Sequence, residues 1–265
     1  MIILTLLPQG LSKCLKMNQL IISADDFGLT ESVTKGISES ILNGVVTRTS
    51  AMMCTNGFAS IKKYAKGLEG KIGLHLQLTD GTPLLGTEEV LSLVDSDGNF
   101  PKKSNQLSMV NPIEVEKEWE AQVKALLDLG ITPSHIDTHH NVHRFPKVFK
   151  VYCSIAKKYQ LSARALSPIM AKKIDSFGLL GSNYCLETWF GNNITCSNLI
   201  ENLTKAFQSI KNNGIVELMC HPGYVDQNLE SRSSYLQARE KELEIFLDPK
   251  LKELLKQNNI QLIEA

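Results

Sequence analysis

The chain has 265 residues, of which 43% are hydrophobic and 21% charged, and its 28 basic and 28 acidic side chains cancel. This is the composition of a soluble globular protein, and zero net charge gives no electrostatic case for a nucleic-acid or anionic-membrane partner. The six cysteines are scattered without a C-x-x-C pair. Their spacing argues against a disulfide framework or a zinc ribbon and predicts a cytoplasmic protein with reduced thiols.

The first residues form an apolar extension before the first predicted element. The run from Met1 to Leu7 is too short to span a bilayer, and it lacks the basic region and cleavage site of a signal peptide. We expect residues 1–17 to be a poorly ordered extension, or Met17 to be the true start. The remaining residues, 18–265, are predicted to form one domain.

From residue 20 onwards, apolar strands and amphipathic helices alternate. The patterns predict strands over residues 20–24, 45–53, 72–78, 135–139, 161–166, 184–190, 215–220 and 260–263. They predict helices over residues 30–43, 58–65, 112–130, 145–159, 197–211 and 239–257. Such alternation is typical of parallel strands joined by right-handed crossovers. We therefore predict an α/β fold, a (β/α) barrel-like single domain with seven or eight mainly parallel strands. A doubly wound sheet is the alternative, although no G-x-G-x-x-G follows the first strand.

One long polar segment interrupts the alternation. Residues 79–110 contain several glycines and prolines and little periodicity. Loops of this length in compact domains are usually functional. We expect this segment to be either a lid over the site or an arm that contacts a second copy of the chain.

Polar residues that can carry chemistry collect at the ends of four predicted strands. They are Asp25 and Asp26, then His75, then the run Asp137-Thr138-His139-His140-Asn141-Val142-His143, and finally His221. In a parallel barrel these strand ends open on one face, which holds the active site. Each histidine alone is more simply a hydrogen-bonded core residue, and each aspartate a helix cap or a loop ion pair. Together on one face they predict a catalytic site.

Two imidazoles and one carboxylate with open positions are a common ligand set for a catalytic divalent metal. A second carboxylate beside that set can accept a proton from water as a general base. Side chains alternate along a strand, so Asp137 lies one layer below His139 and is expected to hydrogen-bond a neighbouring imidazole. Adjacent aspartates on a strand point in opposite directions, so Asp25 and Asp26 need a special turn to reach the same site.

The four motifs resemble those of the YdjC-like carbohydrate deacetylases, which include enzymes that remove one acetyl group from diacetylchitobiose. The motifs are Ala24-Asp25-Asp26-Phe27-Gly28, Gly73-Leu74-His75-Leu76, the run from Asp137 to His143, and Met219-Cys220-His221-Pro222-Gly223. The resemblance runs in the same order through nearly the whole chain. It implies a barrel-like fold, a magnesium ion or another divalent ion such as Zn²⁺, and a homodimer. Many family members carry three consecutive histidines where this chain has His139-His140-Asn141.

The resemblance also implies roles for individual residues. Asp26, His75 and His139 would bind the metal, Asp25 would be the catalytic base, and His221 an acid or a substrate contact. Arg164 matches a family arginine and would contact a sugar or acetyl oxygen, unless it is an ordinary ion-pair arginine. The further candidates for substrate binding are His140, His143, Trp189 and Tyr224.

We therefore predict a metal-dependent hydrolase that removes an acetyl group from a small N-acetylated sugar. One alternative is a metal-dependent phosphoesterase on a similar barrel, although only Arg144 and Arg164 lie near the predicted site to bind phosphate. Another is a sugar-binding protein with a vestigial site. The sequence does not identify the sugar, its length or the physiological metal.

Overall fold

The structure is a computed structural model that describes residues 17–210 and 214–264. Nearly all of the predicted N-terminal extension lies outside the described residues. The described strands are β1 (Asn18–Phe27), β2 (Arg48–Ala51), β3 (Ile72–Leu76), β4 (His135–Thr138), β5 (Ser162–Ala163), β6 (Tyr184–Leu186), β7 (Ile215–Cys220) and β8 (Ile260–Leu262).

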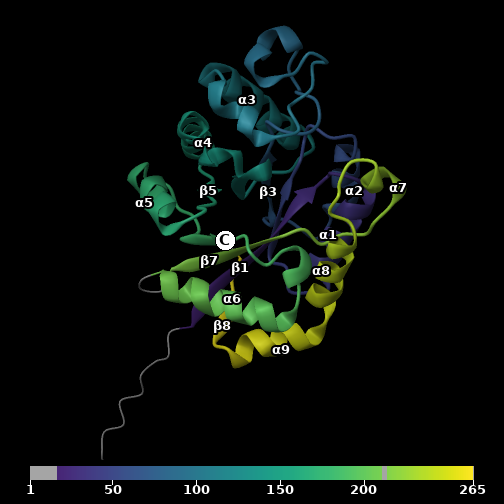
Figure 1. The fold of residues 1–265 in the computed structure, drawn as a ribbon, viewed down its shortest axis with the longest axis vertical. Coiled ribbons are helices and arrows are strands. Elements are labelled where there is room, and N and C mark those ends of the chain that lie inside the picture. Colours follow the sequence, from purple (N-terminus) through teal and green to yellow (C-terminus); the bar gives the residue numbers. More distant parts are fainter. Residues whose placement is uncertain (1–16, 211–213, 265) are drawn as a thin grey trace, which may run out of the picture.

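The strands form one parallel sheet that curls into a barrel-like layer (Figure 1). Its order is β5-β4-β3-β2-β1-β7-β6, and β8 pairs with the first residues of β1. A bridge between Ala163 and Gly181 joins β5 to the segment that leads into β6, so the curled sheet returns toward its own edge. The prediction of a barrel-like α/β domain with seven or eight parallel strands is confirmed.

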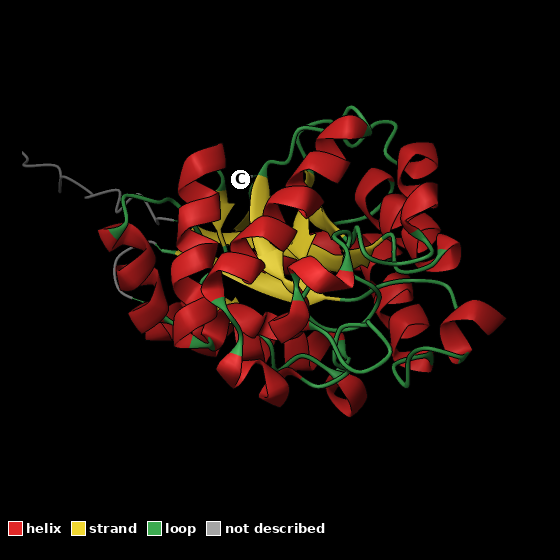
Figure 2. Ribbon diagram, turned by 90° about the horizontal axis from the view of Figure 1, so that it is seen from above, coloured by secondary structure: helices red, strands yellow, loops and turns green. Residues whose placement is uncertain are grey.

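Helices surround this sheet, as the view from above shows (Figure 2). The described helices are α1 (Glu31–Leu42), α2 (Ile61–Tyr64), α3 (Pro112–Asp128), α4 (Pro146–Tyr159), α5 (Pro168–Ser176), α6 (Cys196–Ser209), α7 (Gln227–Glu230), α8 (Gln237–Leu247) and α9 (Pro249–Gln257). Among them, no helix combines the length and the apolar character needed to cross a membrane. Helix α5 lies in a stretch for which the sequence pattern predicts no helix.

Several strands are shorter than predicted. The sequence pattern predicts β2 over residues 45–53, but the strand spans only Arg48–Ala51. The pattern predicts β5 over residues 161–166, but this strand contains only two residues. The flanking Val45, Val46 and Met53 are nevertheless buried. Apolar runs report burial, and burial extends beyond the residues whose backbones pair in a sheet.

Strand β1 lies at the centre of the sheet and ends in a bulge that positions the paired aspartates. Ala24 lies opposite Thr49 and Phe27 opposite Ala51, so β1 has one extra residue over this interval. Asp26 adopts a left-handed conformation, with φ of 73°. A bulge re-aims the side chains next to it, and here both carboxylates line the same cavity. This is the special turn that two adjacent aspartates need to reach one site.

The segment 79–110 contains three short 3₁₀ turns, η2 (Thr87–Glu89), η3 (Leu91–Leu93) and η4 (Ser104–Met109). Its first part is fastened by Glu118 of α3, which is fully buried and accepts hydrogen bonds from the backbone N–H groups of Leu84 and Leu85. These bonds hold this part of the segment against α3.

The close packing of β3 on β4 provides a test of the barrel interior. A methyl group on Gly73 would lie 2.4 Å from the His135 ring, which is fully buried. We expect Gly73→Ala to lower the free energy of unfolding by about 1–3 kcal/mol, because the ring has no space to move into. Equilibrium urea unfolding measures this. In the matched variant Gly86→Ala the new methyl would meet only the flexible Glu88 side chain, and equal unfolding midpoints for the two variants would contradict the expectation.

Candidate active site

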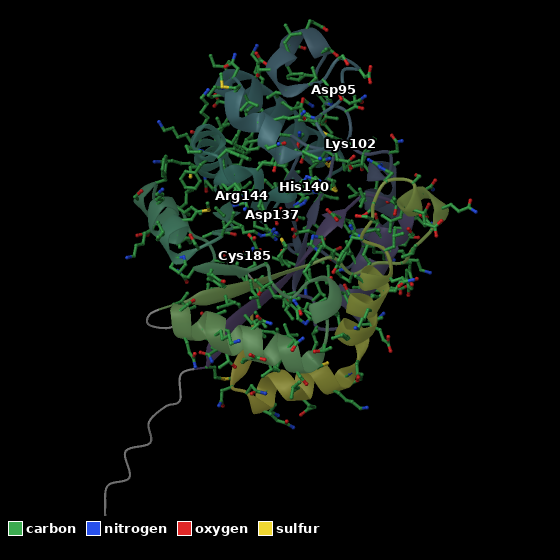
Figure 3. All side chains as sticks on the ribbon, viewed as in Figure 1. Asp95, Lys102, Asp137, His140, Arg144 and Cys185 are labelled. Atoms are coloured by element: carbon green, nitrogen blue, oxygen red, sulfur yellow. The ribbon has the colours of Figure 1, made fainter. Side chains whose placement is uncertain are left out.

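A cavity of about 600 Å³ opens at the carboxyl ends of the central strands. His140 and Lys102, which line the cavity, are labelled in Figure 3, and the buried Asp137 lies close to His140. The predicted site residues that line it are Asp25, Asp26, His75, His139, His140 and His221. The strand-end motifs of the sequence therefore meet in one place.

Three candidate ligand atoms converge at the bottom of this cavity. Asp26 Oδ1 lies 3.6 Å from His75 Nε2 and 3.4 Å from His139 Nδ1, and the two imidazole nitrogens are 3.3 Å apart. A divalent ion that binds its ligands at about 2.0–2.2 Å holds neighbouring ligand atoms slightly more than 3 Å apart. The spacing of this triad fits such an ion.

The hydrogen bonds around the triad leave these atoms available. His75 Nδ1 is 2.6 Å from Asp137 Oδ1, which directs the lone pair of Nε2 toward the cavity and confirms the expected contact between Asp137 and an imidazole. Arg239 of α8 donates to Asp26 Oδ2 at 2.6 Å, whereas the buried Oδ1 has no hydrogen-bond partner. Burial raises the pKa of Asp26, but the positive charge of Arg239 helps to hold this pKa well below its usual range.

A second group of ligand-type atoms, from Asp25, His75 and Asp137, also lies close together. Its carboxylates are already neutralised by Arg164. The guanidinium donates to both oxygens of Asp25, at 2.7 and 2.6 Å, and lies 2.8 Å from Asp137 Oδ2. Metal ions bind to ligands with free lone pairs, so the triad of Asp26, His75 and His139 is the better metal site.

Arg164 therefore differs from the substrate contact that the resemblance implied. It is fully buried, does not line the cavity, and also donates to Glu217 of β7 at 2.8 Å. Arg48 contacts the same Glu217 oxygen at 2.9 Å. Arg164 is an ion-pair residue of the barrel interior that holds Asp25 from below.

Asp25 remains accessible to the cavity despite this pairing. Each of its oxygens receives a bond from Arg164 and keeps a second lone pair. Burial raises the pKa of Asp25 to about 6, and Arg164 opposes this rise. A carboxylate with a pKa near neutrality is suited to accept and release a proton.

Two further predicted histidines lie at the cavity wall. His140 stacks on His139, with ring centroids 3.9 Å apart, and burial lowers its pKa to about 4. His221 follows β7, and its buried Nδ1 has no hydrogen-bond partner. Burial also lowers the pKa of His221 to about 3, so its imidazole is neutral near pH 7.

The structure does not bring His143, Trp189 or Tyr224 to the cavity. His143 is fully buried, stacks on Tyr152 and lies 2.6 Å from the Thr138 hydroxyl. Trp189 is buried against Phe246, and its indole N–H donates to the carbonyl of Thr195. The Tyr224 hydroxyl donates to Glu39 of α1, outside the cavity. Position after a strand end did not distinguish these residues from those that face the cavity.

Sequence reasoning missed the contribution of α8 and the segment before it. Arg239 holds Asp26, and the buried Glu242 accepts bonds from the backbone N–H of His221 and from the Tyr235 hydroxyl. A helix rich in charged residues is usually a solvated surface helix, so its pattern carried no signal that Arg239 and Glu242 would be buried.

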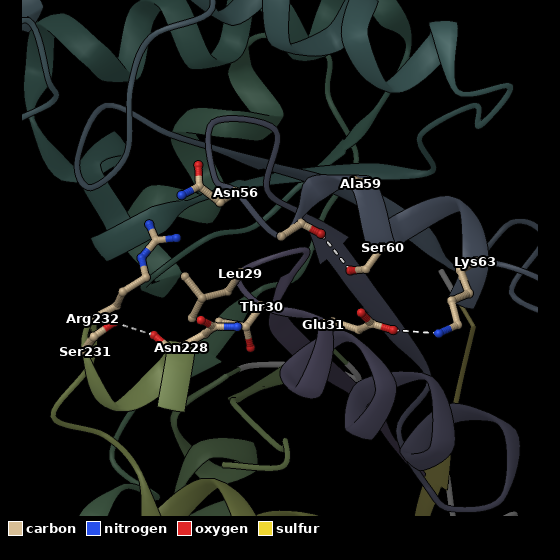
Figure 4. Close-up of a pocket in the computed structure, with 11 residues that line it drawn as sticks. Leu29, Thr30, Glu31, Asn56, Ala59, Ser60, Lys63, Asn228, Ser231 and Arg232 are labelled. Carbon is tan, nitrogen blue, oxygen red and sulfur yellow. Dashed lines mark hydrogen bonds and ion pairs between the residues drawn. The ribbon is translucent and has the colours of Figure 1, made fainter. Parts of the chain in front are cut away.

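A neighbouring cavity of about 520 Å³ lies between the start of α1 and α7 (Figure 4). Arg232 lies at one end and Lys63, paired with Glu31 at 2.6 Å, at the other. It is lined by none of the predicted site residues and by no member of the ligand groups found among the described residues. Of these two cavities, only the one at the strand ends is lined by the candidate metal ligands.

Known proteins resemble this chain in sequence and in fold. Proteins named carbohydrate deacetylase from Clostridium beijerinckii and Geobacillus stearothermophilus are 32% and 34% identical to this chain, and each alignment covers 92% of it and 98% and 95% of those proteins. A crystal structure from Enterococcus faecalis, whose name proposes cellobiose-phosphate cleavage, superposes with a TM-score of 0.85 at 33% identity and covers 94% of this chain and 98% of its own.

A Streptococcus mutans CE4 esterase shares the fold at 11% identity, with a TM-score of 0.52 over 93% of this chain and 85% of its own. The model of the YdjC-like protein family matches residues 19–257, almost the whole described chain. The order of the motifs, the barrel-like fold and this match agree, and the chain belongs to the YdjC-like protein family.

Proposed function

We propose that this protein is a metal-dependent hydrolase that removes an acetyl group from an N-acetylated mono- or oligosaccharide. The observation that carries the proposal is the unpartnered Asp26 Oδ1 facing His75 and His139, with the carboxylate of Asp25 beside it in the same cavity. The relatives named carbohydrate deacetylase support the reaction and the class of substrate.

Asp26, His75 and His139 are the proposed metal ligands. When bound, a divalent ion supplies Lewis acidity, which polarises a carbonyl and makes water more acidic. Asp137 holds His75 in the tautomer that leaves Nε2 free, and Arg239 holds Asp26 so that only Oδ1 faces the site. The resemblance favours magnesium, and the ligand set also suits zinc.

Asp25 is the proposed general base that accepts the proton of the attacking water. Its raised pKa suits this role, and the two-pronged bond to Arg164 fixes the direction of its free lone pairs. His140 and His221 line the same cavity and are proposed to contact the substrate. Because His221 is neutral, it would act by hydrogen bonding rather than as a positively charged acid.

The two arginines that the sequence places near the predicted site are both paired with carboxylates. Arg164 is bound to Asp25, Asp137 and Glu217 within the barrel, and Arg144 lies 3.5 Å from Glu187. This disfavours the phosphoesterase alternative.

Location in the cytoplasm and assembly as a homodimer stay predictions.

Removal of metal provides the first test of the function. We expect incubation with excess EDTA followed by desalting to abolish the release of acetate from N,N′-diacetylchitobiose, and added Mg²⁺ or Zn²⁺ to restore it, because the triad carries the Lewis acid. An enzymatic acetate assay over a panel of N-acetylated mono- and disaccharides measures this. Full activity in the chelated protein would exclude metal dependence.

Two variants separate the roles of the catalytic base and the metal ligands. We expect Asp25→Asn to bind metal like the wild type but to lower kcat by about 10²–10⁴-fold, the usual contribution of a general base. We expect His139→Ala to lose the metal, because only two of the three protein ligands remain. Elemental analysis of dialysed protein and acetate release are measured for both. If both variants lost metal equally, the division of roles would be wrong.

Arg164 is expected to matter for stability more than for substrate affinity. Arg164→Gln leaves buried carboxylates without their cation, and breaking such a buried pair lowers the free energy of unfolding by about 3–5 kcal/mol. Arg144→Gln breaks an ion pair whose partners are both partly exposed, and we expect it to change the free energy of unfolding by less than about 1 kcal/mol. Urea unfolding of the two variants measures this. Wild-type stability of Arg164→Gln, with only KM raised, would instead support a direct substrate contact.

A further inference from the structure

One wall of the catalytic cavity is aromatic. Phe190, in the loop after β6, lines the cavity together with Tyr235 and His221. Phe190 is 46% exposed, whereas its neighbour Trp189 is 1% exposed and packs in the core. Solvent exposure of a single phenylalanine is common on protein surfaces, but this ring lies at the wall of a cavity and is held in a fixed orientation.

Stacking on Tyr235 sets the orientation of the Phe190 ring. The centroids of the Phe190 and Tyr235 rings are 4.2 Å apart and their planes differ by 9°. The Phe190 and His221 rings are nearly perpendicular, with centroids 6.1 Å apart. Tyr235 is itself fastened, because its hydroxyl donates to the fully buried Glu242 of α8. Glu242 also accepts the backbone N–H of His221. The aromatic wall and the polar site are thus attached to the same helix, which also holds Asp26 through Arg239.

The cavity wall also carries polar and charged side chains from other segments. Asp80 and Lys102 belong to the segment 79–110, and Arg232 follows α7. Arg232 lies 3.3 Å from Asp80, so the two segments meet at this point. A cavity with one aromatic surface and several charged side chains suits a ligand that has a flat apolar face and an edge of hydroxyl groups. A pyranose ring has both.

We infer that Phe190 is the surface on which a sugar ring of the substrate stacks, with Tyr235 as its support. This rests on the proposed function and assigns the sugar a position in the cavity. The C–H face of a pyranose needs no hydrogen bonds, so an aromatic ring can cover it without leaving polar groups unpartnered. The stacking helps to place the acetyl group near the triad, while Asp80, Lys102 and Arg232 remain to bind hydroxyl groups.

Kinetic measurements on Phe190 variants test this inference. We expect Phe190→Ala to raise KM for N,N′-diacetylchitobiose about tenfold, because the variant loses one aromatic contact with the sugar and the apolar area that this contact buries. We expect kcat to change by less than about twofold. Phe190→Tyr keeps the ring and is expected to restore the wild-type KM. The matched control is Phe58→Ala, since Phe58 is 41% exposed and lies outside the catalytic cavity.

A structural role for Phe190 would give a different result. A lower kcat and a lower melting temperature with unchanged KM, or no change at all, would overturn the inference. Calorimetric titration of the EDTA-treated proteins with the same disaccharide separates the inference from the proposed function. If the EDTA-treated wild type binds the sugar and EDTA-treated Phe190→Ala binds it about tenfold more weakly, while the metal-loaded wild type releases no acetate, the stacking surface stands and the proposed reaction fails. If the wild type neither binds nor hydrolyses the panel of sugars, both are overturned.

Discussion

The interior of this barrel depends on the ion pairs of one buried arginine. Asp25, Asp137 and Glu217 come from three different strands, and all three are withdrawn from water. An unpaired buried carboxylate costs several kcal/mol or loses its charge. Arg164 contacts all three with its rigid fork of N–H donors, so it neutralises the acids and also ties β1, β4 and β7 to β5 from inside.

Two different arginines give the adjacent aspartates different surroundings. Without the bulge at the end of β1, Asp25 and Asp26 would point to opposite faces of the sheet. With the bulge, both carboxylates reach the cavity. There Arg164 donates a hydrogen bond to each oxygen of Asp25, whereas Arg239 donates to only one oxygen of Asp26. In the proposed mechanism, Asp25 is therefore the proton acceptor, whereas Asp26 presents a free oxygen beside two imidazoles. The two roles follow from which cation each aspartate meets.

The set of aspartates and histidines was recognisable from the sequence because these residues lie near the ends of strands, and parallel strands bring their ends to one face. The selection of Asp26, His75 and His139 from this set came from the family resemblance. Residues in loops and on charged helices were less predictable. Trp189 and Phe190 are neighbours after the same strand, yet the first is buried and the second lines the cavity. Arg239 and Glu242 resemble the solvated charges of a surface helix, and only their contacts with Asp26, His221 and Tyr235 reveal their part in the site.

The sequence by itself determined the alternation of strands and helices, the barrel-like class, and the set of aspartates and histidines at the strand ends. These depend on local periodicity and on the order of motifs, which a single chain displays directly. The tertiary structure alone decided the bulge at Asp26, the burial of Arg164 beneath Asp25, and the position of Phe190, rather than Trp189 or Tyr224, at the cavity wall. Those depend on which distant side chains share a low-dielectric interior, because pairing there is decided by contacts between strands and helices far apart along the chain.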